Sequence, residues 1–466
     1  MRRRKDTRTE RAQPAGMTDT ALPSRLLLAE ARVPRYTSYP TAAQFGPLEE
    51  ATYRRWLTEQ VSPGDSLSLY VHVPFCRDLC WYCACHTRPT RSAARIEAYL
   101  GALLAEAGQL AEALPAHGGI AHLHLGGGTP SILGPEGLRA LVGLLRERFG
   151  LRPGAELAIE LAPRLFDAPL AGTLGELGFT RASLGVQDID LEIQRRIGRP
   201  QPVEQVAEAA RMLRAAGIAG VNIDLMYGLP GQTEDHVAAS ARFAAGLGAD
   251  RLAVFGYAHL PSARPHQRAI DAALLPGAAA RMAQAERAER ELVAAGYVAL
   301  GLDHFARPED PLAIAAAEGR LRRNFQGYTT DAAPVLLGLG ASAIGSLPGG
   351  FAQNLVDERR YAEAVAAGHL PVAHGLAVTV EDRLRGNLIE RLMCDFALDL
   401  DLDRPEAAAV IRDALPRLVE LEGEGLVRRG PGRLEVTPLG RRFVRQVAAC
   451  FDVHAGAAAA RYSVAV

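Results

Sequence analysis

Four cysteines stand close together in the sequence, and this group has the clearest chemical meaning. Cys76, Cys80, Cys83 and Cys85 follow the spacing C-x3-C-x2-C-x-C. Disulfides are typical of small secreted domains, whereas clustered thiols in a chain of 466 residues indicate a metal site. Three thiolates on a short loop can bind an iron–sulfur cubane and leave one iron open to a further ligand.

Zinc is the main alternative for these cysteines. Structural zinc sites more often contain two C-x2-C pairs set well apart. Cys83 and Cys85 also fit poorly into one tetrahedron with the other two thiols. The spacing therefore favours a [4Fe–4S] cluster, and the distant Cys394 and Cys450 are expected to be buried core thiols.

The chain around and after the cysteines alternates short apolar runs with long helical stretches. Each unit has about 30–40 residues, the size of a right-handed strand–helix repeat with parallel strands. Strands are predicted at 67–73, 122–125, 156–161, 181–186, 221–227 and 251–257, and helices at 92–114, 135–149, 167–177, 203–216 and 235–247. Six units predict an α/β fold with an incomplete (β/α)6 barrel, because a full barrel has eight.

Residues of functional character follow each predicted strand. In parallel barrels the chemistry lies at the carboxyl ends of the strands. The cysteines follow the first strand, and a Gly-Gly-Gly-Thr-Pro run at 126–130 follows the second. The later strand ends carry Glu160, Gln187, Asp188, Asp224, Tyr257 and His259. A purely structural protein has no reason to place polar groups at one end of every strand, so we expect an active site there.

The character of the sequence changes beyond residue 375. Helices are predicted at 381–396 and 405–424, followed by a hairpin at 425–437 and a helix after Pro438. This arrangement predicts a mostly helical, winged-helix-like domain, but its mixed charges lack the one-sided basic patch that DNA binding requires. We therefore expect it to cover a substrate. The predicted domains are an N-terminal extension at 1–64 (1–16 disordered), a catalytic domain at 65–370 and this C-terminal domain at 371–466.

Charge and hydropathy exclude several classes of protein. The net charge is -1 and the isoelectric point is near 6.9, so the whole chain is not a polyanion binder and no nucleic-acid partner is expected. No run approaches the ~20 apolar residues of a membrane helix. The first sixteen residues are basic without an apolar segment behind them, unlike a secretory signal. We expect a cytoplasmic protein that does not bind membranes.

The cysteine spacing, with an aromatic residue before the third cysteine, resembles that of radical S-adenosylmethionine (SAM) enzymes. The fourth cysteine narrows the resemblance to the family of oxygen-independent coproporphyrinogen III oxidases. The resemblance covers nearly the whole chain, from residues 34–41 to 451–452, and includes segments 69–76, 222–230, 257–261, 303–308 and 323–329. It implies that the catalytic domain is a radical SAM barrel.

The resemblance also implies the site residues. Cys76, Cys80 and Cys83 would bind the [4Fe–4S] cluster, with Cys85 beside it as a catalytic residue that does not coordinate iron. Two SAM molecules are implied, with Gln326 and Ile344 near the second. The implied SAM-binding residues are Tyr70 (also catalytic), Gly127, Gly128, Thr129, Glu160, Gln187, Arg199, Asp224, Ala258, Gln326 and Ile344. Among them, the glycines at 126–128 would let the backbone approach SAM, and Arg199 would pair with its carboxylate.

The implied reaction converts two propionates of coproporphyrinogen III into vinyl groups, giving protoporphyrinogen IX in haem biosynthesis. A 5′-deoxyadenosyl radical, formed when the reduced cluster passes an electron to SAM, would remove a β-hydrogen, after which CO2 and an electron leave. A flavodoxin or ferredoxin would supply the electron, and a monomer is expected. Because the substrate carries four carboxylates, we expect arginines and tyrosines at the barrel mouth: Arg35, Tyr36, Tyr39, Arg307 and Arg323.

Three positions depart from the family pattern. Ala84 stands where glycine is frequent, Ala162 where the pattern has Asp, and His454 where a phenol is more usual. The alternatives are a haem-binding chaperone, a haem-degrading radical SAM methyltransferase, or a metal-binding regulator that uses the C-terminal domain. The first two usually lack the N-terminal segment at 35–40, and the chaperones also lack the fourth cysteine; the balanced charge disfavours the regulator.

Overall fold

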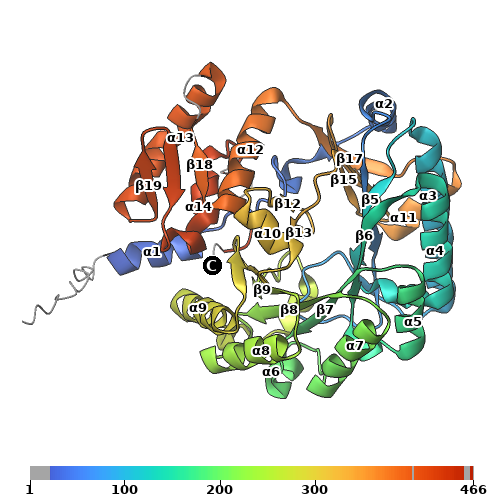
Figure 1. Cartoon of the computed structure of the whole chain (residues 1–466), viewed down its shortest axis with the longest axis horizontal. Helices are drawn as coiled ribbons and strands as arrows, with labels where there is room; N and C mark the ends of the chain where they lie inside the picture. Colours follow the sequence, from blue (N-terminus) through green and yellow to red (C-terminus); the bar gives the residue numbers. More distant parts are fainter. Residues whose placement is uncertain (1–20, 401–403, 456–461, 465–466) are drawn as a thin grey trace, which may run out of the picture.

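The computed structural model describes residues 21–400, 404–455 and 462–464. Its central feature is a curved sheet in which six parallel strands lie side by side (Figure 1). In spatial order these are β2 (Leu67–Val73), β5 (Ile120–Gly127), β6 (Leu151–Leu161), β7 (Arg181–Gln187), β8 (Gly220–Tyr227) and β9 (Arg251–Gly256). Chain order and spatial order coincide, which confirms the incomplete (β/α)6 barrel.

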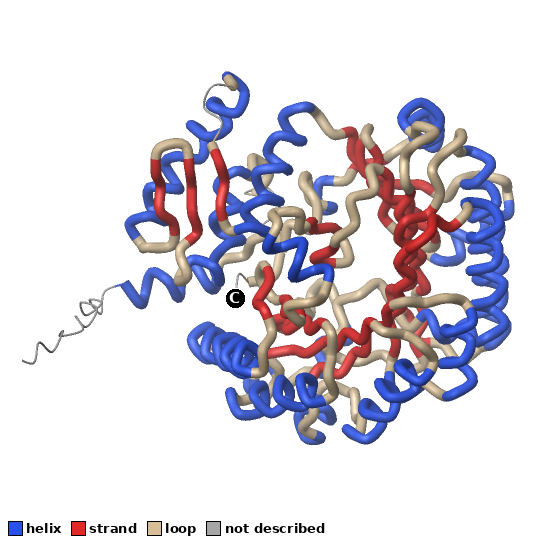
Figure 2. The backbone as a smooth tube through the Cα atoms, viewed as in Figure 1, coloured by secondary structure: helices blue, strands red, loops and turns tan. Residues whose placement is uncertain are grey.

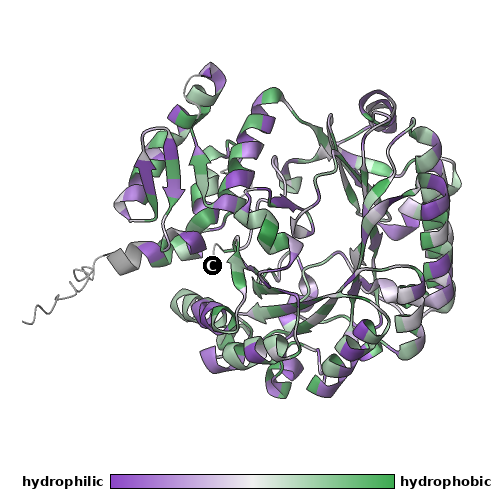
Figure 3. Cartoon of the chain, in the orientation of Figure 1, coloured by the Kyte–Doolittle hydropathy of each residue, from purple (hydrophilic) through white to green (hydrophobic). Residues whose placement is uncertain are grey.

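Helices cover the outer face of this sheet, and Figure 2 shows the strands inside the arc of helices. The connecting helices are α3 (Ala93–Ala113), α4 (Gly134–Phe149), α5 (Ala168–Glu176), α7 (Val203–Ala215) and α8 (Glu234–Gly246), with α9 (Ala278–Ala294) after β9. Several begin at side-chain caps; Ser92 accepts from the Arg95 amide and Thr233 forms a capping box with His236. In Figure 3 the helices carry both apolar and polar residues, as expected for one face on the core and one in water.

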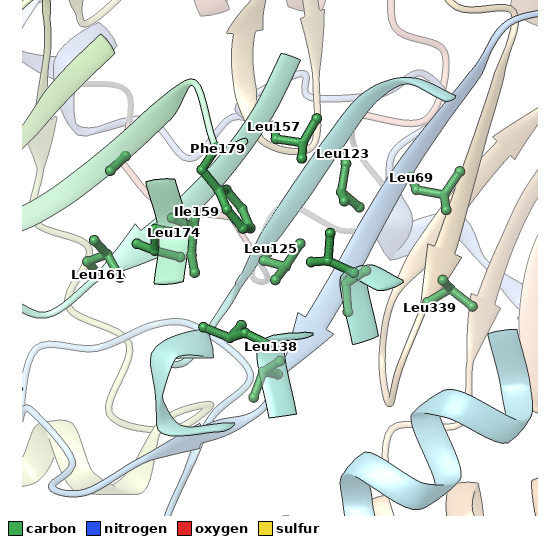
Figure 4. Packing of buried hydrophobic residues seen from close by; sticks show 14 of the residues in the cluster. Leu69, Leu123, Leu125, Leu138, Leu157, Ile159, Leu161, Leu174, Phe179 and Leu339 are labelled. Carbon is green, nitrogen blue, oxygen red and sulfur yellow. The ribbon is translucent and has the colours of Figure 1, made fainter. Parts of the chain in front are cut away.

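The alternation of side chains along each strand separates the core from the cavity. Leu123, Leu125 and Ile159 are fully or almost fully buried and pack outward against the helices, as Figure 4 shows. Successive strand residues point to opposite faces, so their neighbours His124 and Glu160 point into the barrel. The same two-residue period that builds the core therefore lines the barrel interior with polar groups.

The sheet continues beyond the six predicted strands. On one side it adds β14 (Val335–Leu339), parallel to β2, then the antiparallel β15 (Ile344–Leu347), β16 (Gly350–Asn354), β17 (Val372–Ala377) and β1 (Gly46–Pro47). On the other side it adds β11 (His304–Ala306) and β10 (Val298–Leu300). These strands have three to six residues, except the two-residue β1, and sequence periodicity gave no signal for segments so short. Helices α2 (Glu50–Gln60) and α11 (Glu358–Ala366) lie among them in the chain.

The C-terminal part forms a second core. Its elements are α12 (Val380–Asp395), β18 (Ala397–Asp399), α13 (Pro405–Gly423), β19 (Val427–Gly430), β20 (Arg433–Val436) and α14 (Val444–Ala448). The predicted hairpin is β19–β20. N-terminal residues Val33, Tyr36 and Tyr39 pack into this core, and α1 (Ala21–Glu30) lies beside α14 (Figure 1). The division into domains at 64 and 370 stays a prediction, and the disorder predicted for 1–16 lies outside the described residues. None of the described helices combines the length and the apolar run needed to cross a membrane.

Candidate active site

A cavity of about 580 Å³ opens inside the barrel. This volume lies within the roughly 300–1,000 Å³ that is usual for sites of small molecules and cofactors. Its wall includes the cysteine loop, the carboxyl ends of β5–β9 and the hairpin of β12 (Arg322–Asn324) and β13 (Gly327–Thr329). The predicted site residues in this wall are Cys76, Cys80, Cys83, Cys85, Gly127, Gly128, Thr129, Glu160, Gln187, Arg199, Asp224, Ala258 and Gln326.

Tyr70 and Ile344 are the predicted site residues that the structure does not place in this wall. Tyr70 lies on β2 in register with His124, and its hydroxyl donates to Nδ1 of His72 over 3.0 Å. Ile344 is the first residue of β15 and pairs with Gln353 of β16. Both therefore stand beside the cavity, in the part of the sheet that supports it.

The cysteine loop is closed at its base by a short parallel pair. β3 (Phe75–Cys76) pairs with β4 (Arg88–Pro89), which brings the two ends of the loop together. The hydroxyls of Thr129 and Thr87 each lie 3.3 Å from the Cys76 sulfur. Burial raises the pKa of the Cys76 thiol, while these two hydroxyls oppose the rise. The loop thus presents its first sulfur from a fixed position.

The third and fourth cysteines form a pair of unequal acidity. A hydrogen bond from the Cys85 thiol lowers the pKa of Cys83 to about 7, and the same bond keeps the pKa of Cys85 well above its usual value. A thiolate, not a thiol, is the ligand of a metal. Cys83 is therefore prepared to bind iron, whereas Cys85 keeps its proton.

Two arginines face the second cysteine. Arg199 donates from Nη1 to the Cys80 sulfur over 3.3 Å, and Nη2 of Arg164 lies 3.9 Å from the same atom. The Nε atoms of both guanidinium groups are buried without a hydrogen-bond partner among the described residues. A buried charged donor left unpaired is costly, so these atoms indicate an anionic partner that is not part of the chain.

The sulfur arrangement fits a cluster better than zinc. No three His, Cys, Asp or Glu side chains of the described residues are close enough together to hold a single metal ion. In a cubane each thiolate binds a different iron, so the sulfurs stand farther apart than around one zinc ion. Three sulfurs in one cavity wall, with cationic donors facing one of them, fit a cluster and a carboxylate-bearing ligand beside it.

The glycine run packs closely against protein, and Gly127 and Gly128 also line the cavity. Its role in letting the backbone approach SAM stays a prediction. An added Cβ would stand 2.7 Å from the Glu160 carboxylate at Gly126, 2.6 Å from the His72 ring at Gly127 and 2.5 Å from the Phe75 carbonyl oxygen at Gly128. Gly127 also has a φ of +107°. The glycines are needed because the end of β5 nests against the base of the cysteine loop.

Two carboxyl groups of the cavity wall, Glu160 on β6 and Asp224 on β8, differ in acidity. Glu160 accepts from Nε2 of His124 over 3.2 Å and from the Gly127 amide over 3.1 Å, and these bonds lower its pKa against the opposing effect of burial. Burial, followed by repulsion from Glu160, raises the pKa of Asp224 to about 7. The anionic form of Glu160 is thus favoured, and Asp224 changes its charge near neutral pH.

Gln187 shows backbone strain of the kind found at functional sites. It has a φ of +71°, in the left-handed region that non-glycine residues rarely adopt. The pairing of β7 with β8 shifts register between Gly185 and Gln187, which turns the Gln187 side chain into the cavity wall. Such strain persists where the surrounding structure imposes it, often around a ligand.

The curated relatives of similar sequence share one activity in their names. A model of the radical SAM superfamily matches residues 70–244. The oxygen-independent coproporphyrinogen III oxidase of Bradyrhizobium diazoefficiens is 48% identical over 91% of this chain and 95% of that relative. The Pseudomonas aeruginosa protein of the same name is 40% identical over 90% and 93%. The solved coproporphyrinogen III oxidase HemN of Escherichia coli, described as a radical SAM enzyme, matches with a TM-score of 0.85 at 38% identity, over 90% and 97%.

The chain belongs to the oxygen-independent coproporphyrinogen III oxidase family. It is accordingly a radical SAM protein, which uses an iron–sulfur cluster and SAM. The family departure at Ala84 leaves the cysteine loop intact, since the Ala84 side chain is exposed and its carbonyl is hydrogen-bonded. The departure at Ala162 places a methyl group in the cavity wall, directly after the end of β6.

The residues proposed to hold the carboxylates of a coproporphyrinogen divide into two groups. Arg35 and Arg323 line the cavity, and Arg35 forms an ion pair with the buried Asp303. Tyr36 instead donates to Asp452, and Arg307 lies over the Tyr297 ring. Tyr39 is likewise buried in the C-terminal core. The structure therefore brings only the first two of the five to the cavity.

A turn after β9 contains functional residues that the sequence did not reveal. Arg264, His266 and Gln267 donate to three consecutive carbonyl groups of the cysteine loop. In the sequence these residues stand about 180 positions from the loop, and their partners are backbone atoms, so no side-chain spacing could have found them. Their presence directly after the predicted strand at 251–257 was the one available signal.

Proposed function

We propose that this protein catalyses the oxygen-independent oxidative decarboxylation of two propionate side chains of coproporphyrinogen III to vinyl groups, giving protoporphyrinogen IX. The observation that carries the proposal is a single cavity that joins the C-x3-C-x2-C-x-C loop to polar strand ends on β5–β9. Family relatives of 40–48% identity over at least nine-tenths of the chain carry this activity in their names.

Cys76, Cys80 and Cys83 would hold the cluster, and Arg199 would bind the carboxylate of SAM. When bound, the reduced cluster and SAM supply the 5′-deoxyadenosyl radical that removes a β-hydrogen atom from the substrate. Glu160 is anionic and suits the ammonium group of SAM, because its carboxylate is already held by His124 and the Gly127 amide. Gln187 and Asp224 offer polar groups to the ribose from the next two strand ends.

Each reacting propionate loses one β-hydrogen atom, CO2 and one further electron, and becomes a vinyl group. Arg35 and Arg323 are proposed to receive carboxylates of the substrate, because they are the cationic candidates that line the cavity. Cys85 lies in the cavity wall two residues after Cys83 and is proposed to be required for catalysis without coordinating iron. Tyr70 and Ile344 would act from beside the cavity, and Gln326 from its hairpin wall.

The remaining partners follow from the same proposal. A one-electron carrier such as flavodoxin or ferredoxin would reduce the cluster, and a second SAM would serve the second propionate. The C-terminal part, which packs on the segment that carries Arg35, is proposed to cover the substrate and exclude water. We propose a monomer.

An anaerobic assay tests the function. The reconstituted protein is mixed with coproporphyrinogen III, SAM, a reductant and a cell extract as electron acceptor, and porphyrins are separated with fluorescence detection. We expect a tricarboxylate intermediate followed by protoporphyrin. Cys80→Ser should abolish both products, while Cys394→Ser, a buried thiol far along the chain, should not. A protein that cleaves SAM but forms neither product would be a haem-handling relative instead.

A further inference from the structure

The second half of the cysteine loop is gripped by side chains from the turn that follows β9. Gln267 Nε2 donates to the Tyr82 carbonyl over 2.9 Å, and His266 Nε2 donates to the Cys83 carbonyl over 2.7 Å. Arg264 Nε donates to the Ala84 carbonyl over 3.0 Å. Three successive carbonyl groups of the loop are thus each held by a different side chain of a single turn, the short helix Pro265–Ala269 and the residue before it.

The first half of the loop is anchored differently. The Thr90 amide donates to the Cys76 carbonyl over 2.8 Å, and the Trp81 amide donates to the Ile197 carbonyl over 2.9 Å. The Trp81 ring also lies against Gly198, where an added Cβ would stand 3.0 Å from it. Cys76 and Cys80 are therefore fixed by backbone pairing and ring packing. The segment that bears Cys83 and Cys85 has one backbone bond, from the Cys83 amide to the Cys80 carbonyl over 3.2 Å, besides the side chains of the turn.

Gln267 connects this support to the cofactor end of β9. Its side chain is fully buried, and Nε2 donates also to the Ala258 carbonyl over 3.1 Å. Its Oε1 accepts from the Leu260 amide over 2.5 Å. Because every polar atom of this buried amide is used, the position of the loop is tied to the strand end at Ala258, which lines the cavity.

We propose that Arg264, His266 and Gln267 form a clamp that holds the backbone at 82–84 and thereby positions the Cys83 sulfur for iron, which determines how firmly the cluster is retained. The inference rests on the cluster assignment made under the proposed function. These are positioning residues, because they act through backbone carbonyls and touch no reacting atom. A loop without the clamp must be ordered when the cluster binds, and that entropy cost weakens retention.

The test measures iron loss, not turnover. Anaerobically reconstituted His266→Ala and Arg264→Ala are incubated with an excess of an Fe2+ chelator, and iron release is followed by absorbance. Each lost hydrogen bond should accelerate release roughly two- to tenfold, and the double variant should exceed either single variant. Arg268→Ala is the matched control: Arg268 lies in the same turn but is exposed, and its variant should release iron at the wild-type rate.

Two further measurements separate positioning from general loss of fold. His266→Gln keeps an N–H donor on the side chain, so it should release iron more slowly than His266→Ala. The melting temperatures of the cluster-free variants should match that of the cluster-free wild type. Unchanged iron release in the double variant overturns the clamp. So does faster release that appears only together with a lowered melting temperature of the cluster-free protein. A wild-type protein that takes up no cluster rejects the cluster assignment itself, which is a different failure.

Discussion

The two ends of the barrel use charged residues in opposite ways. At the amino end, Arg181 and Arg251 are the first residues of β7 and β9, and both reach Asp310, the N-cap of α10 (Pro311–Ala317). The Nε of Arg251 lies 2.7 Å and the Nη2 of Arg181 3.5 Å from its carboxylate, and Glu156 lies 3.4 Å from Arg181. Two cations and two carboxylates thus compensate each other within the chain.

At the carboxyl end Arg199 lacks such compensation. It is as buried as Arg251, yet within the described residues no carboxylate lies within 4.0 Å of it, and it donates to the Cys80 sulfur and to the Gly185 carbonyl. Each of the two arginines keeps one buried nitrogen without a partner among those residues, so the difference lies in charge and not in hydrogen-bond count. The comparison teaches that the mutually paired charges of Arg181, Arg251 and Asp310 stabilise the fold, while the charge of Arg199 is left for a ligand.

The largest effect is expected at the amino end. Asp310→Ala leaves Arg181 and Arg251 buried beside each other with one carboxylate fewer, and breaking a buried pair in this way costs about 3–5 kcal/mol. The free energy of unfolding, measured by urea denaturation, should fall by this amount. Affinity for SAM, measured on folded protein by calorimetry, should be unchanged. A loss of SAM affinity with full stability would contradict the division between the two ends.

Arg199→Ala should give the reverse result. The variant loses a charge-assisted contact worth about 1.5–3 kcal/mol, so SAM should bind roughly 10- to 100-fold more weakly to the cluster-loaded protein. Since the Arg199 charge is not compensated by a carboxylate, its removal should not lower the melting temperature of the cluster-free protein. Arg251→Ala is the matched control, because it removes a guanidinium of similar burial. It should lower the melting temperature of the cluster-free protein and leave the affinity for SAM unchanged.

Asp224→Asn tests the carboxyl end of the barrel through the pH dependence of the free energy of unfolding. The pKa of Asp224 is raised to about 7, so the folded protein binds more protons than the unfolded one between about pH 4 and 7. Stability due to this carboxyl therefore falls as the pH rises through that window. The variant should be more stable than wild type by roughly 1–2 kcal/mol at pH 8, allowing for screening by water in the cavity, and gain less at pH 5.

Glu160→Gln should change the free energy of unfolding in the opposite direction to Asp224→Asn in the same urea experiment. The pKa of Glu160 is lowered, so its stabilising effect is present above its unfolded pKa and disappears only as the pH falls through the folded value. The variant should therefore be less stable than wild type at both pH 8 and pH 5. If both variants changed the free energy of unfolding in the same direction, Glu160 and Asp224 would not differ in the direction of their pKa shifts.

The residues at the carboxyl end of the barrel could be predicted from the sequence far better than the charge pairs at the amino end. The cysteines and the polar strand ends stand at fixed offsets from apolar runs, so periodicity alone located Glu160 and Asp224. Arg181, Arg251 and Asp310 meet only because β7, β9 and α10 converge in space, and nothing in their local sequence marks the pairing. The contacts of the proposed clamp, Arg264, His266 and Gln267, could not be predicted from the sequence for a similar reason, since their partners are backbone carbonyls.

Prediction of the fold failed where elements were short. The six barrel strands were placed within a few residues, except that β6 begins at Leu151 instead of 156. β15 and β16 have four and five residues and are joined by a glycine turn, so they show too few periods to be recognised. The run at 126–130 was located correctly, but its close packing against Phe75 and His72 could not be predicted, because only the folded structure brings these residues near.

The smallest effect is expected from a second pair at the amino end of the barrel. His122 and Asp331 are 3.6 Å apart, and the His122 side chain is 24% exposed, compared with 5% for Asp310. A partly hydrated pair contributes at most about 1 kcal/mol, so His122→Gln should change the free energy of unfolding by less than that at pH 7. If His122→Gln lowered the free energy of unfolding as much as Asp310→Ala does, position at the amino end alone would explain the stabilisation. A small change would show instead that burial of the charge decides which pairs hold the fold.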